Sequence, residues 1–180
     1  MKAIDYLVRE HEEISRFLDR LEEECISILN NKKVDFRFFK ASIEFIRNYA
    51  DGIHHKKEED ILFKYMIDNL GVLADKVVRG GMLVEHQLAR GYVYDLETSL
   101  SSYKEDPSDK HILQIIATAM GYVNLLRKHV DKENSTVYKF AEDRLSEDVK
   151  SLIEKESIER ITTDKKYEQR KEELFSIIFN

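Results

Sequence analysis

The chain has little of what builds a disulfide-bonded, thiolate-ligated or membrane-spanning protein. Its 180 residues include one cysteine, one proline, six glycines and no tryptophan. Cys25 alone cannot form an internal disulfide or a thiolate-based metal site. No apolar run approaches the roughly 18 residues that span a membrane, and the first residues show no apolar signal segment. These absences predict a cytoplasmic protein with no membrane partner.

Charged residues are abundant but mixed in sign. They make up 36% of the chain, and the formal net charge is −6. No basic cluster marks a nucleic-acid surface, so we expect no nucleic-acid partner. Together with the scarcity of proline and glycine, this composition is typical of long amphipathic helices.

Apolar residues recur every three to four positions along four long stretches, which predicts four helices. The helices cover about residues 3–30, 34–69, 74–104 and 108–144. Gly71 follows one helix end, and Ser108 is the expected N-cap of the last helix. Because the connections are short, we expect an all-α, up-down-up-down four-helix bundle over residues 1–145. One or two extra helices in residues 146–180 either pack on this bundle or form a homodimer surface.

One histidine lies on the apolar face of each predicted helix. These residues are His11, His54, His86 and His129. Residue counts to the helix ends place all four at one level, to within about 5 Å at about 1.5 Å per residue. Glu58 and Glu133 each follow a histidine by four positions and therefore share its face. A lone buried histidine is more often a hydrogen-bonded core residue, but this set indicates a metal centre, because a cation offsets the cost of burying such groups.

Imidazole nitrogens and carboxylate oxygens without a thiolate suit iron, manganese or zinc. A carboxylate can bridge two cations, so two glutamates from opposite helices favour a two-metal centre. His55 lies about 100° round the helix from His54 and is either a ligand of the second metal or solvent-facing; we favour ligation. Glu59 is expected to be solvated or to bond to a ligand. Glu85 is either a surface charge or a carboxylate that orients a ligand imidazole.

Other polar and aromatic residues are expected to lie outside the centre. Phe63 and Tyr138 each follow a candidate glutamate by five positions, and at helical spacing they lie opposite the histidine. We therefore expect both rings to pack outward against a neighbouring element. His111 is about 27 Å from His129 along its helix and does not belong to the site. Tyr122 is expected in the core.

The segments around these residues resemble the hemerythrin-like HHE cation-binding family over about residues 1–145. The matching elements are His11-Glu12, His54-His55-Lys-Lys-Glu58-Glu59, Glu85-His86 and His129-Val-Asp-Lys-Glu133. The resemblance implies a non-haem di-iron centre bridged by Glu58 and Glu133, with the four histidines of the apolar faces as terminal ligands. Oxygen-carrying hemerythrins place another histidine one turn before the His86 position, where this chain has Met82. His55 would supply that imidazole, and the departure weakens the case for reversible oxygen carriage.

The expected function is therefore that of a di-iron protein that binds dioxygen, nitric oxide or peroxide for sensing, storage or detoxification. Zinc or manganese could replace iron. The alternatives are a di-iron enzyme of oxidative or nitrosative stress repair and an iron-sensing regulatory domain; we favour binding or sensing over catalysis. A ferritin-like oxidase is disfavoured because its helices use Glu-x-x-His rather than the reverse order.

Overall fold

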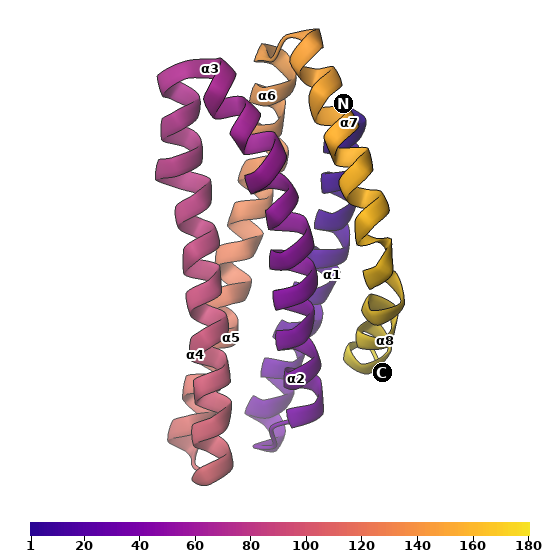
Figure 1. Cartoon of the computed structure of the whole chain (residues 1–180). Coiled ribbons are helices and arrows are strands. Elements are labelled where there is room, and N and C mark those ends of the chain that lie inside the picture. The colour runs from indigo at the N-terminus through magenta and orange to yellow at the C-terminus, as the bar shows by residue number, and fades with distance from the viewer.

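The computed structural model describes residues 1–180 and consists of four long helices packed side by side, followed by a C-terminal pair (Figure 1). The first long helix is α1 (Lys2–Asn31). The second runs through α2 (Phe36–Phe45), η1 (Ile46–His55), η2 (Glu58–Leu62) and the start of α3 (Phe63–Val77). The third contains the rest of α3, η3 (Val78–Met82) and α4 (Leu83–Glu105). The fourth contains α5 (Asp109–Lys132), η4 (Glu133–Val137) and α6 (Tyr138–Arg144).

The predicted up-down-up-down order is confirmed, and local chemistry sets the breaks between the long helices (Figure 1). Asp35 caps α2 by accepting hydrogen bonds from two backbone N–H groups, Arg37 at 2.8 Å and Phe38 at 3.0 Å. Gly71 has a φ of 70° inside α3, a conformation that favours glycine, and it turns the second long helix into the third. Ser108 stands at the predicted N-cap of α5 without a side-chain capping bond.

The C-terminal helices pack on the bundle. α7 (Glu147–Asp164) contacts α1, and after the short η5 (Lys165–Tyr167), α8 (Glu168–Ile178) lies against α2. Leu174 of α8 joins the core, and the buried Lys171 ammonium lies 3.0 Å from Glu13. Glu13 therefore lies at the contact between α1 and α8.

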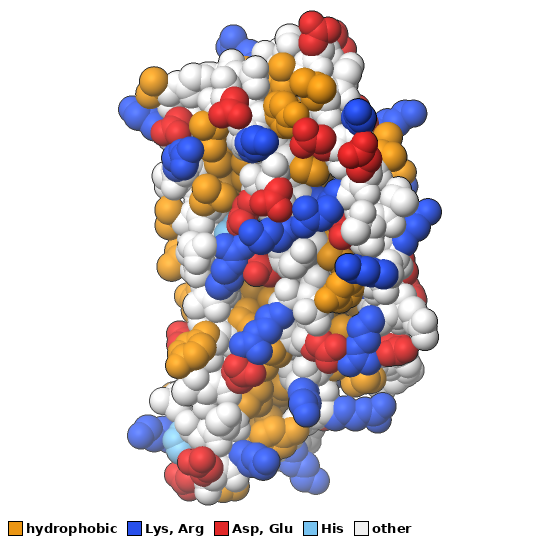
Figure 2. All heavy atoms as spheres, viewed as in Figure 1, with side chains coloured by type: hydrophobic (Ala, Val, Ile, Leu, Met, Phe, Trp, Pro, Cys, Tyr) orange, Lys and Arg blue, Asp and Glu red, His pale blue; other side chains and the backbone are white.

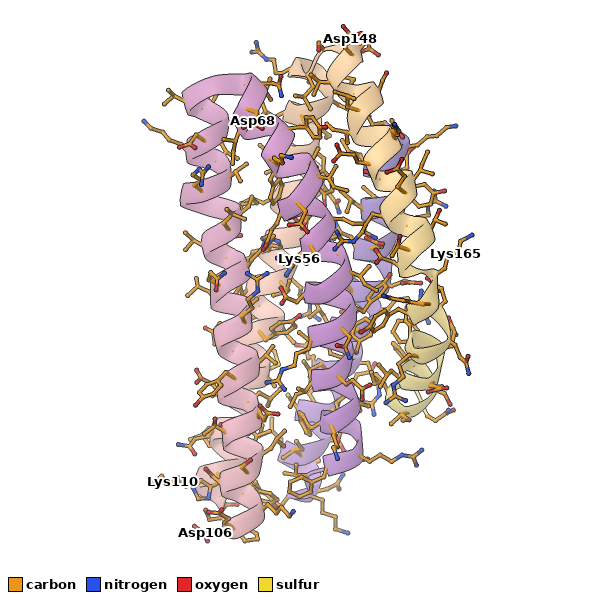
Figure 3. The ribbon with its side chains drawn as sticks, in the orientation of Figure 1. Lys56, Asp68, Asp106, Lys110, Asp148 and Lys165 are labelled. Atoms are coloured by element: carbon orange, nitrogen blue, oxygen red, sulfur yellow. The ribbon has the colours of Figure 1, made fainter.

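The core is divided into two apolar clusters with a polar layer between them. On α1, His11 separates Leu7 of the upper cluster in Figure 1 from Ile14 of the lower cluster. On the third long helix, His86 likewise lies between Met82 and Ala89. Figure 3 labels Lys56, the residue after His55, about halfway along the bundle. The polar layer is thus enclosed by hydrocarbon above and below.

Several turns in the bundle are π-helical, with backbone hydrogen bonds from i to i+5 instead of i to i+4. They are η1, η2, η3 and η4, and they interrupt the second, third and fourth long helices but not α1. Each wide turn accommodates an extra residue, which changes the face presented by all later side chains. η1 ends at His55, η2 begins at Glu58 and η4 begins at Glu133. η1, η2 and η4 therefore coincide with the polar layer, whereas η3 lies in the upper apolar cluster.

The surface carries both signs of charge. On the face drawn in Figure 2, basic and acidic side chains alternate over the helices without a large block of one sign. None of the helices combines the length and the apolar character that crossing a membrane would require.

Candidate metal centre

Seven side chains of the polar layer converge into two overlapping groups of four, each able to offer one ligand atom to a cation. Within each group the ligand atoms lie within 4.8 Å of one another. The three-histidine group consists of His55, Glu58, His86 and His129. The two-histidine group consists of His11, His54, Glu58 and Glu133. All seven residues are the ones that the sequence nominates as ligands, and every long helix contributes to the pair of groups.

In the three-histidine group, imidazoles from three long helices meet. The Nε2 atoms of His86 and His129 are 3.1 Å apart. The rings of His55 and His86 are stacked, with centroids 3.9 Å apart and planes 12° apart. His55 is 2% exposed, so it faces the layer rather than solvent. Because η1 ends at His55, the wide turn allows two consecutive histidines to reach the interior.

The two shared carboxylates lie between the two groups. Oε2 of Glu58 is 3.6 Å from Nε2 of both His54 and His86. Oε2 of Glu133 is 3.2 Å from Nε2 of both His11 and His129. Oε2 of each glutamate thus faces one imidazole of the two-histidine group and one imidazole of the three-histidine group. This is the placement required of a carboxylate that bridges two cations.

Five of the candidate donor atoms are buried without hydrogen-bond partners, and the residues present therefore fit a cation. Nε2 of His54, Nε2 of His55, Oε2 of Glu58 and both carboxylate oxygens of Glu133 have none. Burial of such groups costs several kcal/mol each unless they are compensated. A cation at these atoms would supply the missing interactions.

Without a cation, burial changes the protonation of the same groups. Burial, and secondarily the charge of Glu133, raises the pKa of Glu58 well above its ordinary 4.5. Burial raises the pKa of Glu133 in the same way. Burial also lowers the pKa values of His54 and His55 well below 6.5. Burial therefore favours uncharged side chains in the layer, and neutral imidazoles are the form that binds metals.

Each of the five imidazoles has a hydrogen-bond acceptor behind it, at Nδ1. The Nδ1–O pairs are His11–Asn134 at 2.8 Å, His54–Glu10 at 3.0 Å, His55–Asp51 at 3.3 Å, His86–Glu59 at 2.8 Å and His129–Glu85 at 2.9 Å. An acceptor at Nδ1 fixes the tautomer in which Nδ1 carries the hydrogen, and Nε2 then presents its lone pair to the interior. The orientation of every imidazole is thus suited to metal binding.

Basic residues in turn hold the carboxylate acceptors. Lys57 bonds to Glu10, and Lys132 bonds to Glu85. Arg90 donates to both Asp51 and Glu59, at 2.8 Å each, so one guanidinium supports the acceptors of two histidines. Burial acts to raise the pKa of Glu59, but hydrogen bonds from His86 and Arg90 outweigh it and lower the pKa to about 2. Glu59 therefore remains ionised, whereas burial raises the pKa of Glu10 above its ordinary 4.5 despite the neighbouring Lys57 ammonium.

The structure corrects the prediction that Phe63 and Tyr138 pack outward. Both are 1% exposed. The Phe63 ring lies 6.0 Å from the His86 ring, and the Tyr138 hydroxyl donates to Oε1 of Glu58 at 2.5 Å. The prediction assumed about 100° per residue. Across the π turns η2 and η4, a residue five positions on returns to the same face, so both rings lie over the layer.

Glu59 and Glu85 both accept from imidazoles of the layer, which was one of the two alternatives that the sequence left open for each. The acceptor of His55 is Asp51, four residues before it on the same helix. Glu59 accepts from His86, and Glu85 accepts from His129 rather than from its neighbour in sequence. The spacing of four residues could have identified Asp51, whereas the pairs between helices have no comparable local signal.

Three further residues lie where the sequence places them, outside the donor groups. His111 is near the start of α5, where Nδ1 donates to the backbone carbonyl of Asp106 at 2.7 Å. Cys25 is a buried member of the lower apolar cluster. Met82, in place of the histidine found in oxygen carriers, is 2% exposed and packs in the upper cluster. The fifth imidazole of the layer is therefore that of His55.

Comparison with known proteins agrees with this geometry. The family model of the hemerythrin HHE cation-binding domain matches residues 2–141, which include all seven candidate ligands. Neither a curated protein nor a solved structure matched the chain. The match ends within α6, before the C-terminal helices α7 and α8. The chain belongs to the hemerythrin-like HHE cation-binding family, and its buried histidine–glutamate cluster fits the metal site of such a domain.

Proposed function

We propose that the centre holds two iron ions, one in each group, bridged by Glu58 and Glu133. The observation that carries this proposal is the placement of both buried carboxylates midway between two sets of imidazole nitrogens. One cation would leave the donors of the other group buried and uncompensated. Imidazole and carboxylate donors without a thiolate suit iron, and zinc or manganese remain the alternative metals.

We infer that the protein binds a small ligand, namely dioxygen, nitric oxide or peroxide, for sensing, storage or detoxification. A pair of irons bound by this donor set would supply redox chemistry and a coordination position for such a ligand. The chain supplies oriented imidazoles and a layer closed by apolar side chains above and below. Exclusion of water from the layer strengthens the hydrogen bonds and charge interactions within it.

A regulatory role in iron sensing is the second candidate, and the unpartnered buried donors favour it. Without metal, the layer contains buried carboxylates and imidazoles whose donor atoms lack partners. Metal binding therefore contributes directly to the stability of the bundle. In such a protein, iron availability would determine how much of the chain is folded.

The test is the metal content of protein produced with iron, followed by anaerobic optical titration. We expect about two irons per chain and one reversible spectral change on addition of nitric oxide or on aeration. Sustained turnover of peroxide with a reductant, at about 1 per second or faster, would instead indicate the stress-repair enzyme. One metal per chain, or zinc alone, would contradict the di-iron proposal. A Glu58→Gln/Glu133→Gln variant is the control that lacks both bridges.

A further inference from the structure

Tyr138 places a phenol oxygen among the donor atoms of the centre. Its hydroxyl lies 2.5 Å from Oε1 of Glu58 and 3.4 Å from Nε2 of His11. Its ring is parallel to the His11 ring, with planes 7° apart and centroids 5.5 Å apart. The side chain is 1% exposed, and both polar contacts of its hydroxyl are with candidate ligands.

The backbone is built in a way that brings this hydroxyl inward. Tyr138 directly follows η4, the π turn that begins at Glu133. A regular helix would direct a residue five positions after Glu133 away from the centre, whereas the π turn returns it to the face of that glutamate. π turns within α-helices are frequent at functional sites.

The two groups differ in the number of protein donors, and Tyr138 lies beside the poorer one. With the shared carboxylates counted for both, the three-histidine group has five donors, because Glu133 also lies 3.2 Å from His129. The two-histidine group has four. The Tyr138 oxygen is close to one histidine and one bridging carboxylate of that group. Phenolate oxygen is a hard anionic donor, of the kind that hard cations such as ferric iron prefer.

We propose that Tyr138 is an additional metal ligand, whose oxygen binds, as phenolate, the ferric ion of the two-histidine group. The inference rests on the proposed di-iron function and deepens it. With Tyr138 included, each iron has five protein donors, and one position of a six-coordinate ion remains. The phenol proton is released to solvent when the oxygen binds the ferric ion. A small ligand at this iron must then occupy the remaining position or displace the tyrosine.

The alternative role for Tyr138 is that of a hydrogen-bond donor to Glu58 in the loaded protein. The two roles differ in one spectroscopic property, because a phenolate bound to ferric iron gives a visible charge-transfer band and a hydrogen-bonded phenol does not. Tyr138→Phe keeps the ring and removes only the oxygen. Tyr122→Phe is the matched control, since Tyr122 is also buried but its hydroxyl has no polar partner and belongs to neither donor group.

The experiment measures iron content, the visible spectrum and resonance Raman scattering of oxidised, iron-loaded protein. We expect a charge-transfer band in the wild type and in Tyr122→Phe, and its loss in Tyr138→Phe with about two irons retained. Growth with ring-deuterated tyrosine should shift the enhanced Raman modes of the wild type, a result that does not depend on how well Tyr138→Phe folds. Azide, as a probe ligand, should bind more tightly to Tyr138→Phe than to the wild type.

Two results would overturn the inference. One is a wild type with two irons but neither a charge-transfer band nor a tyrosine isotope shift. The other is a band that persists unchanged in Tyr138→Phe. Either would leave Tyr138 as a hydrogen-bond donor and leave the di-iron proposal intact. Fewer than two irons in the wild type would instead contradict the di-iron proposal, and this inference with it.

Discussion

The two donor groups of the centre are built from the same residue types but differ in the residues that hold their imidazoles in place. The three-histidine group has three imidazoles, and each is backed by a carboxylate that a basic residue holds in place. The two-histidine group has two imidazoles, and one of them, His11, is backed by the neutral amide of Asn134. A carboxylate acceptor raises the basicity of a ligand imidazole more than an amide does. We expect the three-histidine group to bind its metal more tightly.

The difference indicates that the two metals would have different roles. A tightly held ion in the three-histidine group would fix the bridging carboxylates and three of the four long helices. The ion of the two-histidine group, with fewer nitrogens and the Tyr138 hydroxyl beside it, would be the one at which ligands exchange.

Removal of a shared carboxylate should affect both groups at once. Glu58→Ala should reduce iron content from about two to well below one per chain, because Glu58 faces an imidazole of each group. Elemental analysis of purified protein measures the effect. Glu12→Ala, which removes an exposed glutamate next to His11, is the control and should keep both irons. Retention of both irons in Glu58→Ala would show that Glu58 does not bridge.

Removal of both metals should destabilise the fold and make its stability depend on pH. Chelation leaves buried, unpartnered donors that cost several kcal/mol, so the melting temperature at neutral pH should fall clearly. An apo protein as stable as the loaded one would contradict a closed, dry centre.

The sign of the pH dependence follows from the glutamates. Because burial raises the pKa values of Glu58 and Glu133 above 4.5, the folded apo protein retains protons that the unfolded chain has released. This contribution to stability is present at low pH and is lost as pH rises through the raised values. Burial lowers the pKa values of His54 and His55, whose contribution is lost only as pH falls below about 6.5. The apo melting temperature should therefore decrease as pH rises above about 6.5, while that of the loaded protein stays level.

Removal of one imidazole should release the metal of one group and leave the metal of the other in place. His55→Ala should release the ion of the three-histidine group and bring iron content toward one, whereas alanine at the exposed neighbour Lys56 should leave two. Metal analysis combined with the visible spectrum distinguishes these cases. Two tightly held irons with an unchanged spectrum in His55→Ala would show that His55 is buried but is not a metal ligand.

Alteration of a single acceptor should have the smallest effect. Glu59→Gln removes the negative charge behind His86 and should weaken iron binding in the three-histidine group by about tenfold to a hundredfold. Asn134→Asp adds a charge behind His11 and should strengthen iron binding in the two-histidine group. The iron affinities of the two groups should then become more similar. Competition with a chelator of known affinity measures both. An Asn134→Asp variant with weaker binding would contradict the proposed reason for the asymmetry.

Much of the centre could be predicted from the sequence because it depends on regular helical spacing. The intervals between His54 and Glu58 and between His129 and Glu133 are local, and short connections bring the four histidines to one level. Tyr138 could not be placed in this way, because the π turn before it displaces all later side chains by one position around the helix. Which histidine each of Glu10, Glu59 and Glu85 accepts from depends on the rotation of neighbouring helices, which the apolar pattern does not define closely enough.

The number and position of the metals test the central claim most directly. A crystal structure of iron-loaded protein, with anomalous diffraction recorded on both sides of the iron absorption edge, locates each ion and identifies its element. We predict two iron peaks, one among His55, His86 and His129 and one beside His11 and His54, with Glu58 and Glu133 between them. A single peak, or two ions of another element in protein produced with ample iron, would contradict the di-iron assignment.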